Sequence, residues 1–171
     1  MKTPTMDLIE EHGGIMLMLS IMKKVAEKLR AGEEVSKKHL DMILEFLVNF
    51  ADKCHHGKEE DVLFPELFKN PSNQELVTEL IDEHKTGREY IKDMVDSGDL
   101  AGNMEKYIEL LTEHVRKENG VLFPIANNEL SKETQTQMEE QFEKFELEVI
   151  GAGKHEEYHA WLEELKKVYL D

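Results

Sequence analysis

The sequence predicts an all-α protein, an antiparallel four-helix bundle followed by a C-terminal helical extension. Three observations lead to this prediction. Apolar residues recur at helical spacing along nearly the whole chain of 171 residues, without an alternating β-pattern. None of the four prolines interrupts a long periodic run. The loops between the runs are short, which favours antiparallel neighbours.

The first predicted helix covers residues 5–30, after Pro4 and before Gly32. The second begins near Ser36, a residue type suited to an N-cap, and continues through residues 63–67. On each helix, the residues at helical spacing that should face the bundle axis form a stripe. The stripe of the first helix is Leu8, His12, Ile15, Leu19, Met22, Ala26 and Leu29. That of the second is Leu40, Leu44, Leu47, Ala51, His55, Glu59 and Val62. Both stripes therefore contain polar residues at core positions.

The third predicted helix starts after Pro71, where residues 72–75 have the pattern of a capping box, and ends at Gly98. The fourth covers residues 102–124. Their stripes are Val77, Leu80, His84, Gly87, Ile91 and Met94, and Tyr107, Leu111, His114, Glu118, Val121 and Ile125. Two further helices are predicted at 131–150 and 154–170. Residues 1–128 are thus predicted to form the bundle, and residues 129–171 an extension packed on it.

The chain contains an internal repeat. Residues 54–65, CHHGKEEDVLFP, align without gaps with residues 113–124, EHVRKENGVLFP, which pairs His55 with His114 and Glu59 with Glu118. A weaker match pairs His12 with His84, each preceded by a glutamate. The two halves therefore resemble one duplicated helical hairpin, with a histidine on its first helix and His-x-x-x-Glu on its second.

Four histidines and two glutamates lie on stripes that should face the bundle axis. Burying a carboxylate without a partner is costly, so an ordinary core would not use them. Residues four apart on an α-helix differ by only about 40° in direction, so each His-x-x-x-Glu pair points inward together. Imidazoles and carboxylates suit a pair of first-row metal ions, with iron the leading candidate. The predicted metal ligands are His12, His55, Glu59, His84, His114 and Glu118.

The residues around these six allow other interpretations. A single His-x-x-x-Glu is common on amphipathic surfaces, whereas two copies in register point to a metal site. His56 could be a fifth imidazole ligand, or it could take the role of His55, with Glu60 in place of Glu59. The repeat favours His55 as the ligand and an outer or surface role for His56, because His56 aligns with Val115. Arg88 is expected to pair at the surface, or with a carboxylate such as Glu11 or Glu83.

Composition excludes several functions. The net charge of −16 argues against nucleic-acid and anionic-membrane partners, which reward basic patches. Cys54 is the only cysteine, which excludes an intrachain disulfide and a cysteine-rich metal site. There is no apolar run of membrane-spanning length and no signal-peptide h-region near the N-terminus. A cytoplasmic protein without a membrane partner is expected.

The C-terminal extension contains the zinc-protease pattern His-Glu-x-x-His at residues 155–159. A protease is not expected, because no third ligand follows at the usual spacing. The helix is expected to pack on the bundle, and a contribution of His155 or Glu148 to the metal site is left open.

The sequence resembles the hemerythrin-like family, also called HHE cation-binding proteins, over roughly residues 5–128. The segments that carry the resemblance are EEHGGI, CHHGKEEDVLFP, DEHKTGREY and EHVRKENGVLFP. The resemblance implies a hemerythrin-like four-helix bundle that holds two iron ions, bridged by carboxylates and an oxo or hydroxo group. It places the ligands at the same six residues, His12, His55, Glu59, His84, His114 and Glu118.

The chain departs from the oxygen-carrying hemerythrins. Those proteins have His-x-x-x-His on the third helix, where this chain has Arg88 four residues after His84. On the fourth helix they have an aspartate five residues after the histidine, where this chain has Asn119, with Glu118 at four. One imidazole is therefore expected to be missing, and the pattern looks more like the iron-centre repair and stress-response members.

The function expected from this comparison is binding of a small diatomic ligand, O2 or NO, for sensing, storage or stress response. The alternative is an enzyme or repair factor that reduces NO or peroxide, or supplies iron to damaged iron centres. A third possibility is a structural protein that holds zinc or no metal. The protein partner and the oligomeric state are not predicted.

Overall fold

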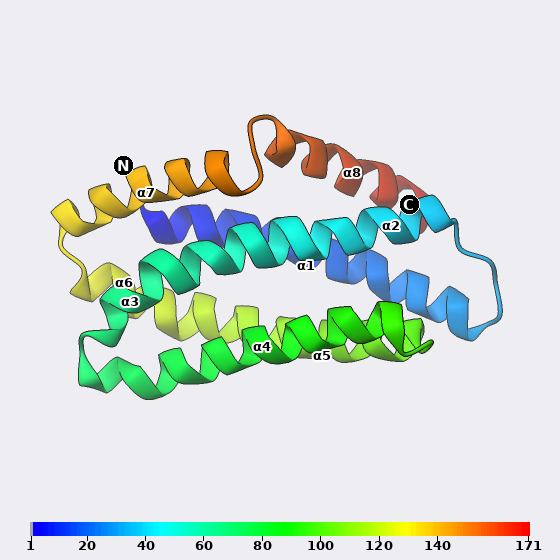
Figure 1. The fold of residues 1–171 in the computed structure, drawn as a ribbon, viewed down its shortest axis with the longest axis horizontal. Helices are drawn as coiled ribbons and strands as arrows, with labels where there is room; N and C mark the ends of the chain where they lie inside the picture. Colours follow the sequence, from blue (N-terminus) through cyan, green and yellow to red (C-terminus); the bar gives the residue numbers. More distant parts are fainter. Residues whose placement is uncertain (1) are drawn as a thin grey trace.

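The computed structural model describes residues 2–171, which form helices and turns, with no strand in that range (Figure 1). The first bundle helix is α1 (Pro4–Arg30). The second consists of α2 (Lys37–Glu45), η1 (Phe46–His56), η2 (Glu59–Leu63) and α3 (Phe64–Phe68). The third is α4 (Gln74–Asp96), after the short turn η3 (Pro71–Asn73). The fourth consists of α5 (Leu100–Lys117), η4 (Glu118–Leu122) and α6 (Phe123–Glu129). The extension contributes α7 (Lys132–Val149) and α8 (Lys154–Tyr169).

Side-chain caps start three of the helices. The hydroxyl of Thr3 accepts a hydrogen bond from the backbone N–H of Met6, Asp99 caps α5 and Ser131 caps α7. The capping box predicted at residues 72–75 is not formed. Instead, Asn70 accepts from the N–H of Ser72 and starts a 3-10 turn that leads into α4.

The second bundle helix is wider than the α-helix that the sequence predicted. Segments η1 and η2 are π-helical. Their backbone hydrogen bonds join residues five apart, whereas those of an α-helix join residues four apart. Its buried residues recur in a four-residue rhythm, which would drift by about 40° per turn around an α-helix. The residues that follow this rhythm between Phe46 and Leu63 are Phe46, Leu47, Phe50, Ala51, Cys54, His55, Lys58, Glu59, Val62 and Leu63, and His56 is buried as well. A wider helix keeps this stripe closer to one face, and η4 repeats the π-helical turn at the second His-x-x-x-Glu.

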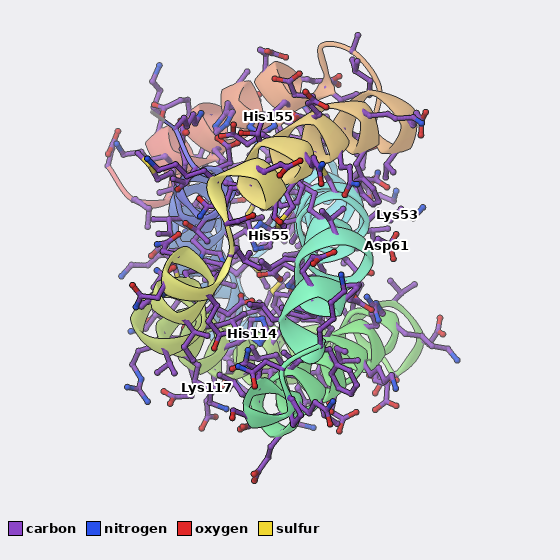
Figure 2. All side chains as sticks on the ribbon, turned by 90° about the vertical axis from the view of Figure 1, so that its left-hand side faces the viewer. Lys53, His55, Asp61, His114, Lys117 and His155 are labelled. Carbon is purple, nitrogen blue, oxygen red and sulfur yellow. The ribbon has the colours of Figure 1, made fainter. Side chains whose placement is uncertain are left out.

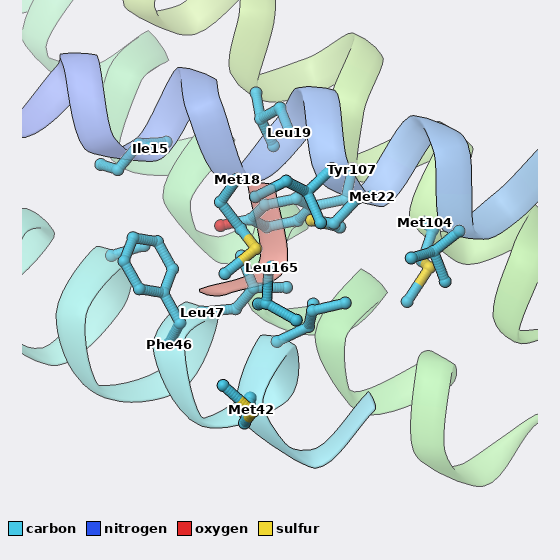
Figure 3. Packing of buried hydrophobic residues seen from close by; sticks show 14 of the residues in the cluster. Ile15, Met18, Leu19, Met22, Met42, Phe46, Leu47, Met104, Tyr107 and Leu165 are labelled. Carbon is cyan, nitrogen blue, oxygen red and sulfur yellow. The ribbon is translucent and has the colours of Figure 1, made fainter. Parts of the chain in front are cut away.

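Two hydrophobic clusters fill the bundle, one toward each end. Ile15 of α1 belongs to the larger cluster, whose packing around Met18, Phe46 and Leu165 is drawn in Figure 3. Leu8, two turns earlier on α1, belongs to the smaller cluster. His12 lies between them along α1, so polar side chains interrupt the core in the middle of the bundle.

Helices α7 and α8 follow each other along one side of the bundle, against α1 and η1 (Figure 1). A Cβ added at Gly57 would come within 2.6 Å of the Phe145 ring, so this glycine permits the close approach of α7 to η1. Phe142 joins the smaller cluster and Tyr158 the larger one. The extension thus shares the bundle's core, and a domain boundary after residue 128 stays a prediction. Within residues 2–171, no helix combines the length and apolar character needed to cross a membrane.

Candidate metal centre

The six residues predicted as ligands meet at the centre of the bundle. They come from α1, the η1–η2 segment, α4, α5 and η4, and Figure 2 places His55 and His114 among the surrounding helices. All six are buried, with at most 2% of their surface exposed: His12, His55, Glu59, His84, His114 and Glu118. Their burial excludes the alternative of surface residues on amphipathic helices.

A seventh residue, His56, joins them. It is only 3% exposed, and its ring stacks on that of His84 with the centroids 3.7 Å apart. A surface position for His56 is therefore wrong, and five imidazoles rather than four lie at the centre. The internal repeat does not indicate a central position for His56, because the residue that aligns with it is Val115. The signal that remained was its three-residue spacing to Glu59, a spacing that also aligns two side chains on a helix.

The seven side chains form two groups in which the donor atoms all lie within 4.8 Å of one another. The first group consists of His56, Glu59, His84 and His114, and the second of His12, His55, Glu59 and Glu118. Glu59 belongs to both groups. One Glu59 oxygen lies 3.3 Å from His84 Nε2, and the other lies 3.8 Å from His55 Nε2.

Glu118 also faces both groups. Its Oε1 lies 3.2 Å from Nε2 of His12, in the second group, and 3.1 Å from Nε2 of His114, in the first. Each glutamate therefore contacts one histidine of each group, which is the placement that two bridging carboxylates need.

Every imidazole is held from outside through Nδ1. Hydrogen bonding at Nδ1 fixes the ring and leaves the Nε2 lone pair for a metal ion. The pairs are His12 with Asn119 (2.7 Å), His55 with Glu11 (3.0 Å), His56 with Asp52 (3.3 Å), His84 with Glu60 (3.0 Å) and His114 with Glu83 (2.8 Å). Buried atoms without a hydrogen-bond partner include Nε2 of His12, His55 and His56, and all four carboxylate oxygens of Glu59 and Glu118. Such groups are expensive to bury, and a pair of cations among them would satisfy them.

The carboxylates that contact the Nδ1 atoms are themselves paired with lysine or arginine side chains. Lys58, only 2% exposed, donates to Glu11 over 2.8 Å. Lys117 donates to Glu83 over 2.6 Å. Arg88 pairs with Asp52 and Glu60 of the second bundle helix, and the expected partners Glu11 and Glu83 are wrong for it.

Burial and neighbouring charges shift the pKa values at the centre. Burial and the charge of Glu118 raise the pKa of Glu59. Burial acts on Glu118 in the same direction, but the charge of the neighbouring His114 lowers its pKa. Burial lowers the pKa of His55 to about 4, which keeps this imidazole neutral, the form that binds a metal ion. Burial also disfavours the charged form of His114, yet Glu118 and Glu83 raise its pKa to about 9.

These shifts predict how the stability of the chelator-treated protein depends on pH. Burial lowers the pKa of His55, His56 and His84 below 6.5, so the unfolded chain binds more protons and stability falls as the pH falls from 6.5. The raised pKa of His114 acts oppositely: its contribution is complete below 6.5 and is lost as the pH rises toward 9. Melting temperatures in chelator from pH 4 to 9 should therefore peak near neutrality. A His84→Gln variant should lose less stability than wild type as the pH falls below 6.5. If the melting temperatures of both proteins fall equally over this range, His84 does not cause the loss.

The HExxH pair does not belong to the centre. Within residues 2–171, no third group of three or more such donors meets the same 4.8 Å limit. His155 instead lies 2.5 Å from Glu146 on α7, beside a surface cleft of about 310 Å³ that His159 also lines. Glu148 is exposed. The structure therefore places neither His155 nor Glu148 at the centre.

Comparisons with known proteins agree with this geometry. A family model described as the hemerythrin HHE cation binding domain matches residues 3–126. The uncharacterized proteins Mb2018 of Mycobacterium bovis and Rv1995 of Mycobacterium tuberculosis are 25% identical to the chain over 157 residues, which cover 85% of it. The alignment spans 62% of the length of these relatives. No solved structure matches the chain significantly. With a match over most of its length, the chain belongs to the hemerythrin HHE cation-binding family.

Proposed function

We propose that the protein binds two iron ions with five histidines and two glutamates, and that this centre binds O2 or NO for sensing, storage or stress response. One observation carries the proposal. Five imidazoles are fixed through Nδ1 from outside, and two buried carboxylates lie between them with no hydrogen-bond partner on any oxygen. The ligands of the proposed site are His12, His55, His56, His84, His114, Glu59 and Glu118.

The donor set favours iron. Imidazole with carboxylate suits iron, whereas copper(I) and iron–sulfur clusters require soft sulfur ligands. Cys54 does not belong to either donor group, and burial raises the pKa of its thiol to about 12, so it is not a thiolate ligand. Glu59 and Glu118, each of which lies near a histidine of both groups, would offset part of the charge of two cations and hold them side by side.

The two metal positions are unequal, and this supports the binding of a small ligand. One group has three imidazoles with Glu59, and the other has the two imidazoles of His12 and His55 with Glu59 and Glu118. With both glutamates bridging, the position of His12 and His55 would have one protein ligand fewer. Iron bound there would supply an open coordination position and a change of oxidation state. The surroundings are apolar: Phe123 stacks on His12 at 5.4 Å, and Leu8 is fully buried. These side chains exclude bulk water and favour a diatomic ligand over a larger one.

The alternative of an enzyme or repair factor rested on a missing imidazole. Because the proposed ligand set includes His56 as a fifth imidazole, it supports ligand binding rather than the alternative.

The proposal is tested by reconstituting the protein with iron under anaerobic conditions and measuring iron per chain, followed by optical spectra with O2 and with NO. We expect about two iron ions per chain and an absorption band that depends on the added gas. A His155→Ala/His159→Ala variant should behave identically. Protein that takes up zinc but no iron, or iron-loaded protein whose spectrum is indifferent to both gases, would contradict the proposal.

A further inference from the structure

Arg88 joins two supporting carboxylates that come from a different helix. It lies on α4, one turn after His84, and its side chain extends to the second bundle helix. Its Nε donates to both oxygens of Asp52, over 2.9 and 3.0 Å, and its terminal NH2 group donates to Glu60.

Each of these carboxylates holds a different imidazole. Asp52 lies 3.3 Å from Nδ1 of His56, and Glu60 lies 3.0 Å from Nδ1 of His84. One guanidinium group therefore fixes the supports of two of the three imidazoles in the group that also contains His114. The planar fork of an arginine is suited to this task, because it offers several donors in a rigid arrangement that a lysine lacks.

The carboxylates need this anchor to stay in place. The side chains of Asp52 and Glu60 are 18% and 24% exposed, so both have access to water. Without the guanidinium, two like charges would face each other across the two imidazoles, and both side chains would gain hydration by turning outward. His56 and His84 would then lose the partners that orient them.

The other metal position has separate supports. His12 is held by the neutral Asn119, and His55 by Glu11, which is paired with the buried Lys58. Within residues 2–171, Arg88 forms ion pairs with Asp52 and Glu60 and with none of these supports.

We propose that Arg88 is a positioning residue that controls metal retention at the position of His56, His84 and His114, and leaves the position of His12 and His55 unaffected. The inference rests on the proposed two-metal site. It deepens that proposal by giving each metal position its own control of affinity.

The test compares iron-loaded wild type with Arg88→Met, Arg88→Lys and the matched control Lys85→Met, an exposed cation on the same helix. Loss of a partner that supports a metal ligand typically costs about 10–100-fold in affinity. In Arg88→Met, we expect one of the two iron ions to pass to a chelator about 10–100-fold faster, while the other leaves at the wild-type rate. Arg88→Lys should lie between, and Lys85→Met should match wild type. Mössbauer spectra should show one iron environment altered and the other retained.

Several outcomes would overturn the inference. Equal acceleration for both iron ions would show a merely structural role, and unchanged release in Arg88→Met would show no role. If Arg88→Met does not fold, Asp52→Asn with Glu60→Gln removes the same anchored charges, and it must give the same selective loss. Wild type without iron would refute the proposed function itself. Wild type with two ions and no selective loss would refute only the role of Arg88.

Discussion

Replacing Glu59 with glutamine is expected to abolish the stabilisation of the protein by metal while leaving the chelator-treated protein at least as stable as wild type. Glu59 is the residue shared by both donor groups, so its replacement affects both metal positions. Without metal, its fully buried carboxylate is costly, and burial together with Glu118 raises its pKa. Glutamine has the same shape and no charge, and its amide supplies a hydrogen-bond donor that the carboxylate of Glu59 lacks.

The expected size of the stabilisation by metal follows from mass action. A ligand at about 1,000 times its dissociation constant stabilises the folded state by about 4 kcal/mol. In a protein of this size, that raises the melting temperature by about 8–16 °C. Wild type should show such a rise on addition of ferrous iron, whereas Glu59→Gln should show little or none. The matched control Glu109→Gln, an exposed glutamate on α5, should keep the full rise. Equal destabilisation of Glu59→Gln with and without metal would mean that Glu59 serves only the fold.

Replacing His56 with alanine is expected to reduce the iron content from about two ions per chain to about one. His56 is one of three imidazoles in its group, and the group of His12 and His55 does not include it. Losing the ligand itself should weaken that position by more than the roughly 10–100-fold that loss of a supporting partner costs. Iron analysis after dialysis against a weak chelator measures the effect.

The neighbouring His55 provides the comparison. His55→Ala should also leave about one ion, but in the other position, so the two variants should retain different Mössbauer signals. His155→Ala serves as the control, because its ring lies in a surface cleft outside both groups. Full retention of two ions in His56→Ala would restore the set of six ligands that the sequence predicts.

The sequence predicts the bundle because its signals are local and strong. The predicted first helix, residues 5–30, differs by one residue from α1, Pro4–Arg30. The six candidate ligands were found for a related reason: burial of a histidine or a glutamate on an apolar stripe is expensive, so its presence there indicates a compensating partner. The repeat then related the two halves, and the structure brings all six side chains together.

The features that were missed depend on geometry that α-helical periodicity does not describe. On an α-helix, His56 points about 100° away from His55. The π-helical turns of η1 and η2 reduce the angle between successive residues, and His56 is buried beside His55. For Arg88 the sequence favours a surface pair, with Glu11 or Glu83 as the alternative, whereas its partner Asp52 lies 36 residues away on another helix. Both errors concern how side chains from different helices meet.

An anomalous difference map at the iron absorption edge, from crystals of the iron-loaded protein, tests the two-iron centre most directly. The account predicts two iron peaks inside the bundle, both beside Glu59, with one among His56, His84 and His114 and the other next to His12 and His55. A single central peak, or iron found only in the surface cleft of His155 and His159, would contradict it.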